Sequence, residues 1–342
     1  MRKVINKVYE KVKEYIKDNW VSIIILVVFA VFCFYDTGYS IYKPGGTINA
    51  SNRVSGDNLY DSDGSFNMAY VSMLKGRLPY YLFAKYFTSW NIVKNDNLTV
   101  SELEDMSDVI ARDNLYYKRA IKDAIYVAFK ESNVDFKVDS TDYYIFYKSL
   151  ENDSDLKIGD KLISYDEYNF NGVDDFAEYI NSKNEGDIIK IKYERNNKEL
   201  ETKTSIYKNS DKLYVGLSVV PIINIESDYN LEVKTKGSES GPSGGLITTL
   251  AIYNALTKED ITRGKKIVGT GTISSDGKVG EIGEVAYKLA AAEKAHADIF
   301  ICPKENYEEA LKFAKEKKYD ILIVEVSSFE ETINYLKNME EN

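Results

Sequence analysis

The chain has 342 residues, 44% of them apolar and 29% charged, a balance that is typical of folded proteins and argues against disorder. Its net charge is −10 and no basic stripe follows the first 19 residues, so a nucleic-acid-binding surface is excluded. The single histidine, His296, argues against a zinc site and leaves any Ser-His-Asp triad dependent on that residue alone. Two cysteines, Cys33 in an apolar run and Cys302 in a strand-like run, do not predict a disulfide.

Residues 1–19 form a basic segment, and Trp20 to Tyr35 follow it as sixteen residues without a charge. A helix needs roughly 20 apolar residues to cross a bilayer, and flanking residues can extend this run, so we predict a transmembrane anchor at 20–42. A secretory signal peptide has a run of similar length, but no A-x-A-like cleavage site follows here. A lipoprotein signal would use Cys33, although the bulky Phe32 stands where a small residue is expected.

The orientation of this anchor follows from charge. Lysine and arginine outnumber acidic residues in 1–19, and such an excess favours the cytoplasmic side of a membrane. We therefore predict a single-pass protein of the cell membrane with a cytoplasmic N-terminus and all its later domains outside the cytoplasm. Trp20 and Tyr35 bracket the apolar run where interfacial aromatic residues sit, which favours a spanning helix over a buried core helix.

The segment 43–131 begins with Pro44-Gly45-Gly46, which is predicted to interrupt regular secondary structure. A strand is predicted over Phe66 to Leu74, after the turn signal Asp63-Gly64. A helix is predicted over Ser101 to Glu131, because apolar residues recur there at three- and four-residue steps. These residues are Tyr117, Ile121, Ala124, Ile125 and Ala128.

The segment 132–207 is predicted to be a β-rich module with one helix, Val173 to Ser182. Its predicted strands are Tyr143 to Tyr147, Lys161 to Tyr165 and Ile188 to Tyr193. The Gly159-Asp160 pair makes a tight turn into an apolar strand, and Asn196-Asn197 suits a hairpin tip. A resemblance to the PDZ domains of bacterial envelope proteases lies in Leu156-Lys157-Ile158-Gly159-Asp160-Lys161-Leu162-Ile163, Gly186-Asp187 and Arg195-Asn196-Asn197-Lys198. It implies that the module captures a polypeptide by strand addition.

The clearest chemical signal is Ser238 to Gly245, with the sequence SESGPSGG, which leads into a predicted helix over Leu246 to Thr257. Ser243 therefore stands where a helix begins, so its hydroxyl is exposed and nearby free backbone N–H groups can stabilise an oxyanion. A helix cap is the alternative, because serine is a common N-cap residue. No strand-GxxxxGK(S/T)-helix pattern occurs in the chain, so ATP is not a predicted ligand.

A serine nucleophile needs a base, and with one histidine in the chain a buried lysine is the candidate. Lys288 lies on the apolar face of a predicted helix, whereas most other lysines sit in charged runs. The residues that share this face are Val285, Ala291, Ala292 and Ala295. The alternative is a lysine at the edge of the face whose amine snorkels to solvent.

Two groups of motifs resemble Lon proteases. Gly241-Pro242-Ser243-Gly244-Gly245 is similar to the Lon nucleophile motif, G-P-S-A-G. The second group resembles the Lon segment that ends at the catalytic lysine. It consists of Gly269-Thr270-Gly271-Thr272-Ile273, Gly277-Lys278-Val279, Ile282-Gly283 and Lys288-Leu289-Ala290-Ala291-Ala292. The strand-like Ile299 to Pro303, with Asn306 beyond it, resembles the segment after the lysine. With the anchor and the PDZ-like module, these motifs resemble the membrane-anchored, PDZ-bearing Lon-like proteins of Gram-positive bacteria.

The resemblance implies a role for each matching residue. Ser243 would attack the scissile carbonyl, Lys288 would take its proton, and Thr270 would orient the lysine amine. Three further residues of the nucleophile motif would support the site, namely Gly241, Pro242 and Gly244.

Three positions depart from the family pattern. Gly244 replaces the usual alanine, Glu284 replaces a usual glycine, and Ser240 stands where many Lon enzymes have an acidic residue. A carboxylate at Glu284 would lie one turn before Lys288, and an opposite charge so close raises a lysine pKa, against the needs of a general base.

The implied fold is α/β, a Lon proteolytic domain (ribosomal-S5-domain-2-like) with an inserted PDZ domain and one preceding transmembrane helix. Residues 43–131 would form its N-terminal part, 132–207 the insertion, and 208–342 the part that carries the dyad. The implied function is an ATP-independent, membrane-anchored serine endopeptidase acting on extracytoplasmic polypeptides, without cofactor or metal. Lon relatives assemble into rings, so a homo-oligomer is also implied. The alternative is a non-catalytic, peptide-binding scaffold that retains the protease fold.

Overall fold

The structure is a computed structural model that describes residues 2–101 and 104–339. The chain forms two compact units. The first comprises the residues up to Lys43 together with Ser72–Asn97, and the second comprises Pro44–Val71 and the residues from Leu98 onward. Strands β1 (Asp36–Asn49) and β3 (Ser65–Arg77) each contain residues of both units.

The first unit begins with helix α1 (Arg2–Phe34), which has a kink at Asn19. By length and composition, Val4–Phe34 could cross a membrane. Residues 36–42, which the sequence assigns to the end of the anchor, instead begin β1. The helix stops there because the Asp36 carboxylate accepts a hydrogen bond from the Gly38 amide at 3.0 Å, and Gly38 has a φ of 75° that a helix does not allow.

The rest of the first unit is formed by the outer half of β3, α2 (Leu78–Phe87), β4 (Asn91–Lys94) and η2 (Asn95–Asn97). Strand β4 pairs antiparallel with β1, with Tyr39 opposite Lys94. Helix α2 begins with proline at its first turn, where the missing N–H costs nothing. The sequence motifs did not predict this helix.

The second unit contains a sheet in which β18 (Leu322–Val326), β17 (Ile299–Pro303), β14 (Lys266–Gly269), β3 and β1 are successive neighbours. The three C-terminal strands and β3 are mutually parallel. The strand predicted over Phe66 to Leu74 is confirmed within β3, and the one over Ile299 to Pro303 is confirmed as β17.

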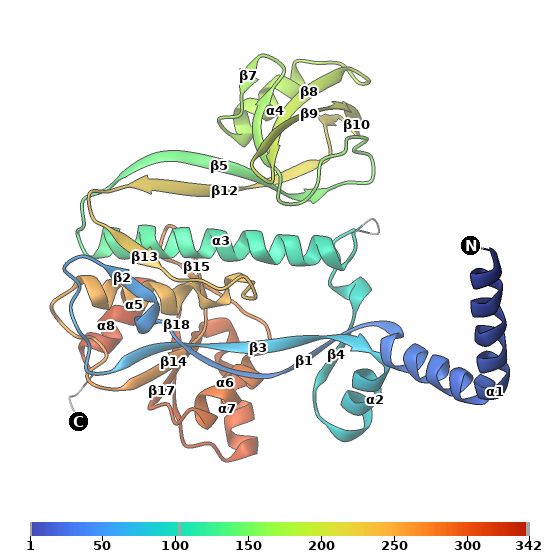
Figure 1. Ribbon diagram of the computed structural model, residues 1–342. Coiled ribbons are helices and arrows are strands. Elements are labelled where there is room, and N and C mark those ends of the chain that lie inside the picture. The colour runs from blue at the N-terminus through green and yellow to red at the C-terminus, as the bar shows by residue number, and fades with distance from the viewer. Residues whose placement is uncertain (1, 102–103, 340–342) are drawn as a thin grey trace. The chain divides into compact units, whose positions relative to one another are not determined.

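Helices cover both faces of this sheet, as the alternation of side chains along β17 requires. Ile299 and Ile301 join one apolar cluster with α3 (Met106–Glu131), α5 (Gly245–Leu256) and α8 (Phe329–Lys337). Phe300 and Cys302 join a second cluster with α6 (Val285–Lys294) and α7 (Lys304–Lys317). Figure 1 shows these two helix layers on either side of the strands.

Helix α3 begins later than the sequence predicts. The expected start at Ser101 is replaced by Met106, because Asp105 caps the helix by accepting the amides of Ser107 and Asp108. The predicted residues 102–103 lie outside the described residues. The helix predicted over Leu246 to Thr257 is confirmed as α5.

The PDZ-like module is a second sheet in the order β12-β5-β6-β8-β9, with β7 attached to β6. Its elements are β5 (Lys137–Lys148), β6 (Lys161–Tyr165), β7 (Tyr168–Asn169), α4 (Val173–Asn181), β8 (Ile188–Arg195), β9 (Lys198–Ser205) and β12 (Leu217–Glu226). The predicted strands and helix are confirmed, and Asn196 and Asn197 form the hairpin tip with positive φ. Strand β12 lies at the edge of this sheet.

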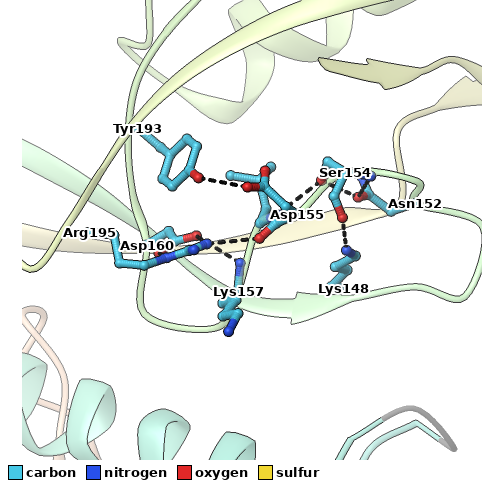
Figure 2. A network of polar contacts seen from close by, with 9 residues as sticks. Lys148, Asn152, Ser154, Asp155, Lys157, Asp160, Tyr193 and Arg195 are labelled. Carbon is cyan, nitrogen blue, oxygen red and sulfur yellow. Dashed lines mark hydrogen bonds and ion pairs between the residues drawn. The ribbon is translucent and has the colours of Figure 1, made fainter. Parts of the chain in front are cut away.

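The predicted turn at Gly159-Asp160 is held by a polar network (Figure 2). Asp160 is 1% exposed, and both of its carboxylate oxygens accept hydrogen bonds from Arg195 at 2.7 Å. Arg195 also donates to the Asp155 carbonyl at 2.9 Å, while the Lys157 amide donates to Asp160 at 2.7 Å. The buried charge is therefore paired, which makes its desolvation tolerable.

Short elements complete the second unit. They are η1 (Ser51–Arg53), β2 (Val54–Gly56), β10 (Tyr207–Asn209), β11 (Lys212–Tyr214), β13 (Leu231–Val233), η3 (Pro242–Gly244), β15 (Thr272–Ile273) and β16 (Val279–Gly280). Strand β13 pairs with β2, and β15 pairs with β16. Because β2 directly follows η1, the pairing of β13 with β2 places the segment shortly before Ser243 next to η1.

Candidate active site

Ser243 lies in the short helix η3, directly before α5. The preceding Gly241 has a φ of 81°, which a residue with a side chain adopts only with strain, so this turn requires glycine. The Gly241 amide donates to the Asp113 carbonyl at 3.0 Å, which ties the turn to α3. Leu246, at the start of α5, donates its amide to the Gly271 carbonyl at 3.1 Å. The half-buried Ser243 is therefore held from both sides.

Thr270 and Ser243 are brought together by the fold. The carbonyl oxygen of Ser243 accepts the Thr270 hydroxyl at 3.0 Å and the Gly271 amide at 2.8 Å. Thr270 follows β14 directly and is fully buried. The backbone of the candidate nucleophile is thus fixed to the carboxyl end of a central strand. A threonine hydroxyl that donates once still has lone pairs with which to accept another hydrogen bond.

The glycine at position 244 has a packing explanation. A Cβ atom there would come within 2.9 Å of the Met68 sulfur. At Gly245, a Cβ atom would come within 2.8 Å of an Ile273 methyl carbon and 3.1 Å of the Ile273 backbone nitrogen. Met68 therefore occupies the space that the usual alanine at position 244 would use, and Gly245 allows close approach of α5 to β15.

Lys288 is buried on α6, with 3% of its surface exposed. Its helix neighbours Val285, Leu289 and Ala292 belong to the apolar cluster that also contains Val268 of β14. This burial rules out a snorkelling lysine. Burial also lowers the pKa of Lys288 to about 8, since desolvation disfavours the charged amine, while the Glu284 carboxylate acts in the opposite direction. The neutral form of this amine is therefore more populated near physiological pH than that of an ordinary lysine.

Glu284 caps α6 in a left-handed conformation, with φ 60° and ψ 40°. Glycine adopts this conformation without penalty, whereas glutamate adopts it with strain. Glu284 is partly buried, and its carbonyl accepts the Lys288 amide at 3.3 Å. The Glu284 carboxylate raises the pKa of Lys288, in the direction expected from the sequence, but the effect of burial is larger.

Asn306 supports the loop that leads into α6. Its side-chain oxygen accepts the Ile282 amide at 3.0 Å, and its nitrogen donates to the Ile282 carbonyl at 2.9 Å. Asn306 is 4% exposed, so this paired contact satisfies both halves of a buried amide.

The sequence motifs missed an acidic residue that holds the loop before Ser243. Both carboxylate oxygens of Glu239 are bound by the Arg53 guanidinium, at 2.6 and 2.7 Å, and the Tyr117 hydroxyl donates to Glu239 at 2.8 Å. These contacts, the Arg53 ion pair first, lower the pKa of Glu239 to about 2. Glu239 thus places a paired carboxylate one position before Ser240. Position 239 carried no signal, because its partners lie 186 and 122 residues away.

A cavity of about 250 Å³ lies beside Pro242, between α3 and β15. Its polar wall includes Asp123, which is 3% exposed and paired with Arg119 at 3.3 Å. The other lining residues are Tyr116, Ala120, Thr272, Ile273 and Ser274. The residue immediately before the candidate nucleophile therefore borders a space large enough for a side chain.

Comparison with known proteins gives two domain matches. Residues 235–338 match the Lon protease (S16) C-terminal proteolytic domain, and residues 150–206 match the PDZ domain. Both families were predicted from the motifs, and both predictions are confirmed.

Curated relatives agree with the first match. Lon protease of Campylobacter jejuni is 28% identical over 137 residues, 39% of this chain and 17% of the relative. Lon protease of Dictyoglomus thermophilum is 35% identical over 97 residues, 28% of this chain and 12% of the relative. Lon protease 2 of Bacillus subtilis is 33% identical over 110 residues, 32% of this chain and 19% of the relative. The chain thus spans less than a fifth of the length of these relatives.

Two solved structures are similar to part of this chain. The PDZ domain of the SdrC-like protein from Listeria monocytogenes is 24% identical and has a TM-score of 0.22, covering 25% of this chain and 94% of that chain. The second domain of a Listeria protein is 26% identical and has a TM-score of 0.19, covering 26% of this chain and 88% of that chain.

The fold is α/β, and the two matches point to the class of proteins that combine a proteolytic domain with a PDZ domain. More narrowly, residues 235–338 are similar to the Lon protease proteolytic domain family, and residues 150–206 are similar to the PDZ domain family.

Proposed function

We propose that this chain is a serine endopeptidase in which Ser243 is the nucleophile and Lys288 is the general base. The burial of Lys288 within the Lon-type domain carries the proposal, because it lowers the pKa of the amine to about 8. A lysine with an ordinary pKa of 10.5 would be almost fully protonated at neutral pH and could not take a proton from serine.

The reaction follows from these roles. The Ser243 hydroxyl attacks the scissile carbonyl while the Lys288 amine takes its proton, and the resulting ammonium then protonates the leaving amine. A water molecule, deprotonated by the same lysine, hydrolyses the acyl-enzyme. Backbone N–H groups of Ser243 and Gly244, at the start of a helix, are the proposed oxyanion donors. Thr270 would accept a hydrogen bond from the lysine amine and orient it.

The PDZ domain implies peptide binding. We place the bound segment along the edge of β12, where main-chain groups can pair with an added strand. Leu217 and Val219 of this strand pack against the apolar cluster that includes Phe176 and Ile180 of α4. The cavity beside Pro242 would receive a substrate side chain next to the scissile bond.

The proposed setting is extracytoplasmic, with α1 as a single-pass anchor whose basic N-terminal end is cytoplasmic. Substrates would be loose or extended polypeptides, cleaved without ATP. The chain would act as a homo-oligomer.

The test compares Ser243→Ala and Lys288→Ala with the wild type, using the full chain in detergent and an unfolded, fluorescently labelled polypeptide. Both variants are expected to lose at least about 1,000-fold in kcat/KM. Matched controls are Ser238→Ala, an exposed serine of the same loop, and Lys294→Ala, an exposed lysine of the same helix. Equal cleavage by all five proteins would reject the dyad, whereas absence of cleavage by all five would favour a peptide-binding scaffold.

A further inference from the structure

Helix α2 presents an aromatic face to the outside of the first unit. Four aromatic residues recur on it at three- and four-residue steps, and each is at least 49% exposed. They are Tyr80, Phe83, Tyr86 and Phe87. Soluble proteins rarely leave a contiguous aromatic surface uncovered, so this face indicates an interaction site.

The opposite side of α2 is packed against its own unit. Ala84 is 1% exposed, and the Tyr81 ring lies 5.1 Å from the Tyr39 ring of β1. Helix α2 is therefore held in one rotational orientation, with its aromatic face directed outward. The ring centroids of Phe83 and Trp90 also lie 5.7 Å apart, which extends the aromatic face toward β4.

The position of α2 identifies what covers this face. The Leu78 amide, at the start of α2, donates to the Tyr35 carbonyl at 2.9 Å, directly after the end of α1 at Phe34. The Arg77 guanidinium lies 5.2 Å from the Phe34 ring centre. If α1 spans a bilayer, its end at Phe34 marks the boundary of the hydrocarbon layer. The hydrogen bond from Leu78 to Tyr35 therefore places the first turn of α2 at that boundary.

The polar residues beside the face suit a lipid headgroup layer. The Lys85 amine lies 5.6 Å from the ring centres of Tyr81 and Tyr86, and the Lys43 amine lies 5.6 Å from that of Trp90. Tyrosine and tryptophan concentrate at the membrane interface, and lysine extends from there to phosphate groups. A second copy of the chain would not require this combination of aromatic rings and neighbouring cations.

We propose that α2 is an interfacial membrane helix that inserts its aromatic face into the headgroup boundary, on the side where the C-terminal end of α1 emerges. The first unit is then attached to the bilayer at two places, through α1 and through α2. This inference rests on the proposed anchoring by α1, but not on the serine-lysine chemistry.

The test measures the depth of a fluorescent probe in nanodiscs that hold the full chain in a mixture of zwitterionic and anionic lipids. An environment-sensitive NBD label is attached to Phe87→Cys in a Cys33→Ala background, since Cys302 is fully buried. A label on the natural Cys33 reports insertion of α1, and a label on Tyr168→Cys, an exposed tyrosine of β7, is the matched control. Each sample is exposed to lipids brominated near the top of the acyl chain and to aqueous iodide.

At position 87 we expect brominated lipid to remove most of the fluorescence and iodide to have little effect, whereas position 168 should show the reverse. Quenching at Cys33 without quenching at position 87 would overturn the proposal while leaving the anchor intact. Protection from both quenchers at position 87 would show that protein covers the face, which also overturns it. Absence of lipid quenching at Cys33 would reject the anchor and this inference together.

Discussion

The Arg53 guanidinium donates hydrogen bonds to both carboxylate oxygens of Glu239, at 2.6 and 2.7 Å. Glu239 lies four residues before Ser243. Arg53 ends η1, and Glu239 lies in the loop that leads to the nucleophile. The ion pair is mostly buried, with side-chain exposures of 13% and 16%. An interaction of this geometry restricts the loop more than a solvated surface pair would.

The first prediction concerns this ion pair and acid stability. Because the folded-state pKa of Glu239 is about 2 against an ordinary 4.5, the pair stabilises the fold above pH 4.5 and is lost as pH falls toward 2. We expect Glu239→Gln to lower the free energy of unfolding at pH 7 by roughly 1–3 kcal/mol, and to lose this deficit at low pH. Chemical denaturation between pH 2 and 7 measures it. Glu201→Gln, which breaks an exposed pair with Lys190, is the control and should change stability by less than about 0.5 kcal/mol.

The second prediction concerns the pH dependence of cleavage. A general base acts in its neutral form, so kcat/KM should rise with pH and level off above a pKa near 8, that of Lys288. Lys288→Arg should be inactive across this range, because a guanidinium stays protonated. A profile that is flat between pH 6 and 9 in the wild type would contradict the assignment of the base.

The third prediction separates two effects of Glu284. Its carboxylate raises the pKa of Lys288, so Glu284→Gln should move the midpoint of the pH profile to lower pH. Glu284→Gly should move it in the same direction and also increase stability by up to about 1 kcal/mol, since glycine removes the left-handed strain. Glu293→Gln, on the same helix, does not remove a charge that acts on Lys288 and should leave the midpoint unchanged. An unaltered midpoint in both Glu284 variants would show that the carboxylate has no effect on the base.

The fourth prediction concerns Thr270. Replacing it with valine keeps its volume but removes the hydroxyl that donates to the Ser243 carbonyl at 3.0 Å. We expect Thr270→Val to lower kcat by about 10- to 100-fold with little change in KM, because the nucleophile loses its orientation. Thr270→Ser should restore most of the rate. If valine and serine variants are equally impaired, the hydroxyl is not what positions the nucleophile, and the loss reflects packing around a buried residue.

Local patterns in the sequence determined several features of this protein. Periodic apolar residues predicted α3 and α5, and the apolar face around Lys288 made it the candidate for a buried lysine, with a snorkelling amine as the alternative. The hairpin tip at Asn196-Asn197 was also evident, because turn residues express a backbone preference of a few neighbouring residues. The start of α3 was placed too early, because one capping residue, Asp105, decides where a helix begins.

Only the tertiary structure decided what holds the site together. Glu239 meets Arg53 across 186 residues of chain, and Thr270 meets the Ser243 carbonyl across 27. The aromatic face of α2 became meaningful only when Leu78 was found hydrogen-bonded to Tyr35, at the end of α1. Short-range backbone preferences act through adjacent dihedral angles, so the local sequence determines them. Pairings between distant residues depend on which strands become neighbours, and no local pattern encodes that choice.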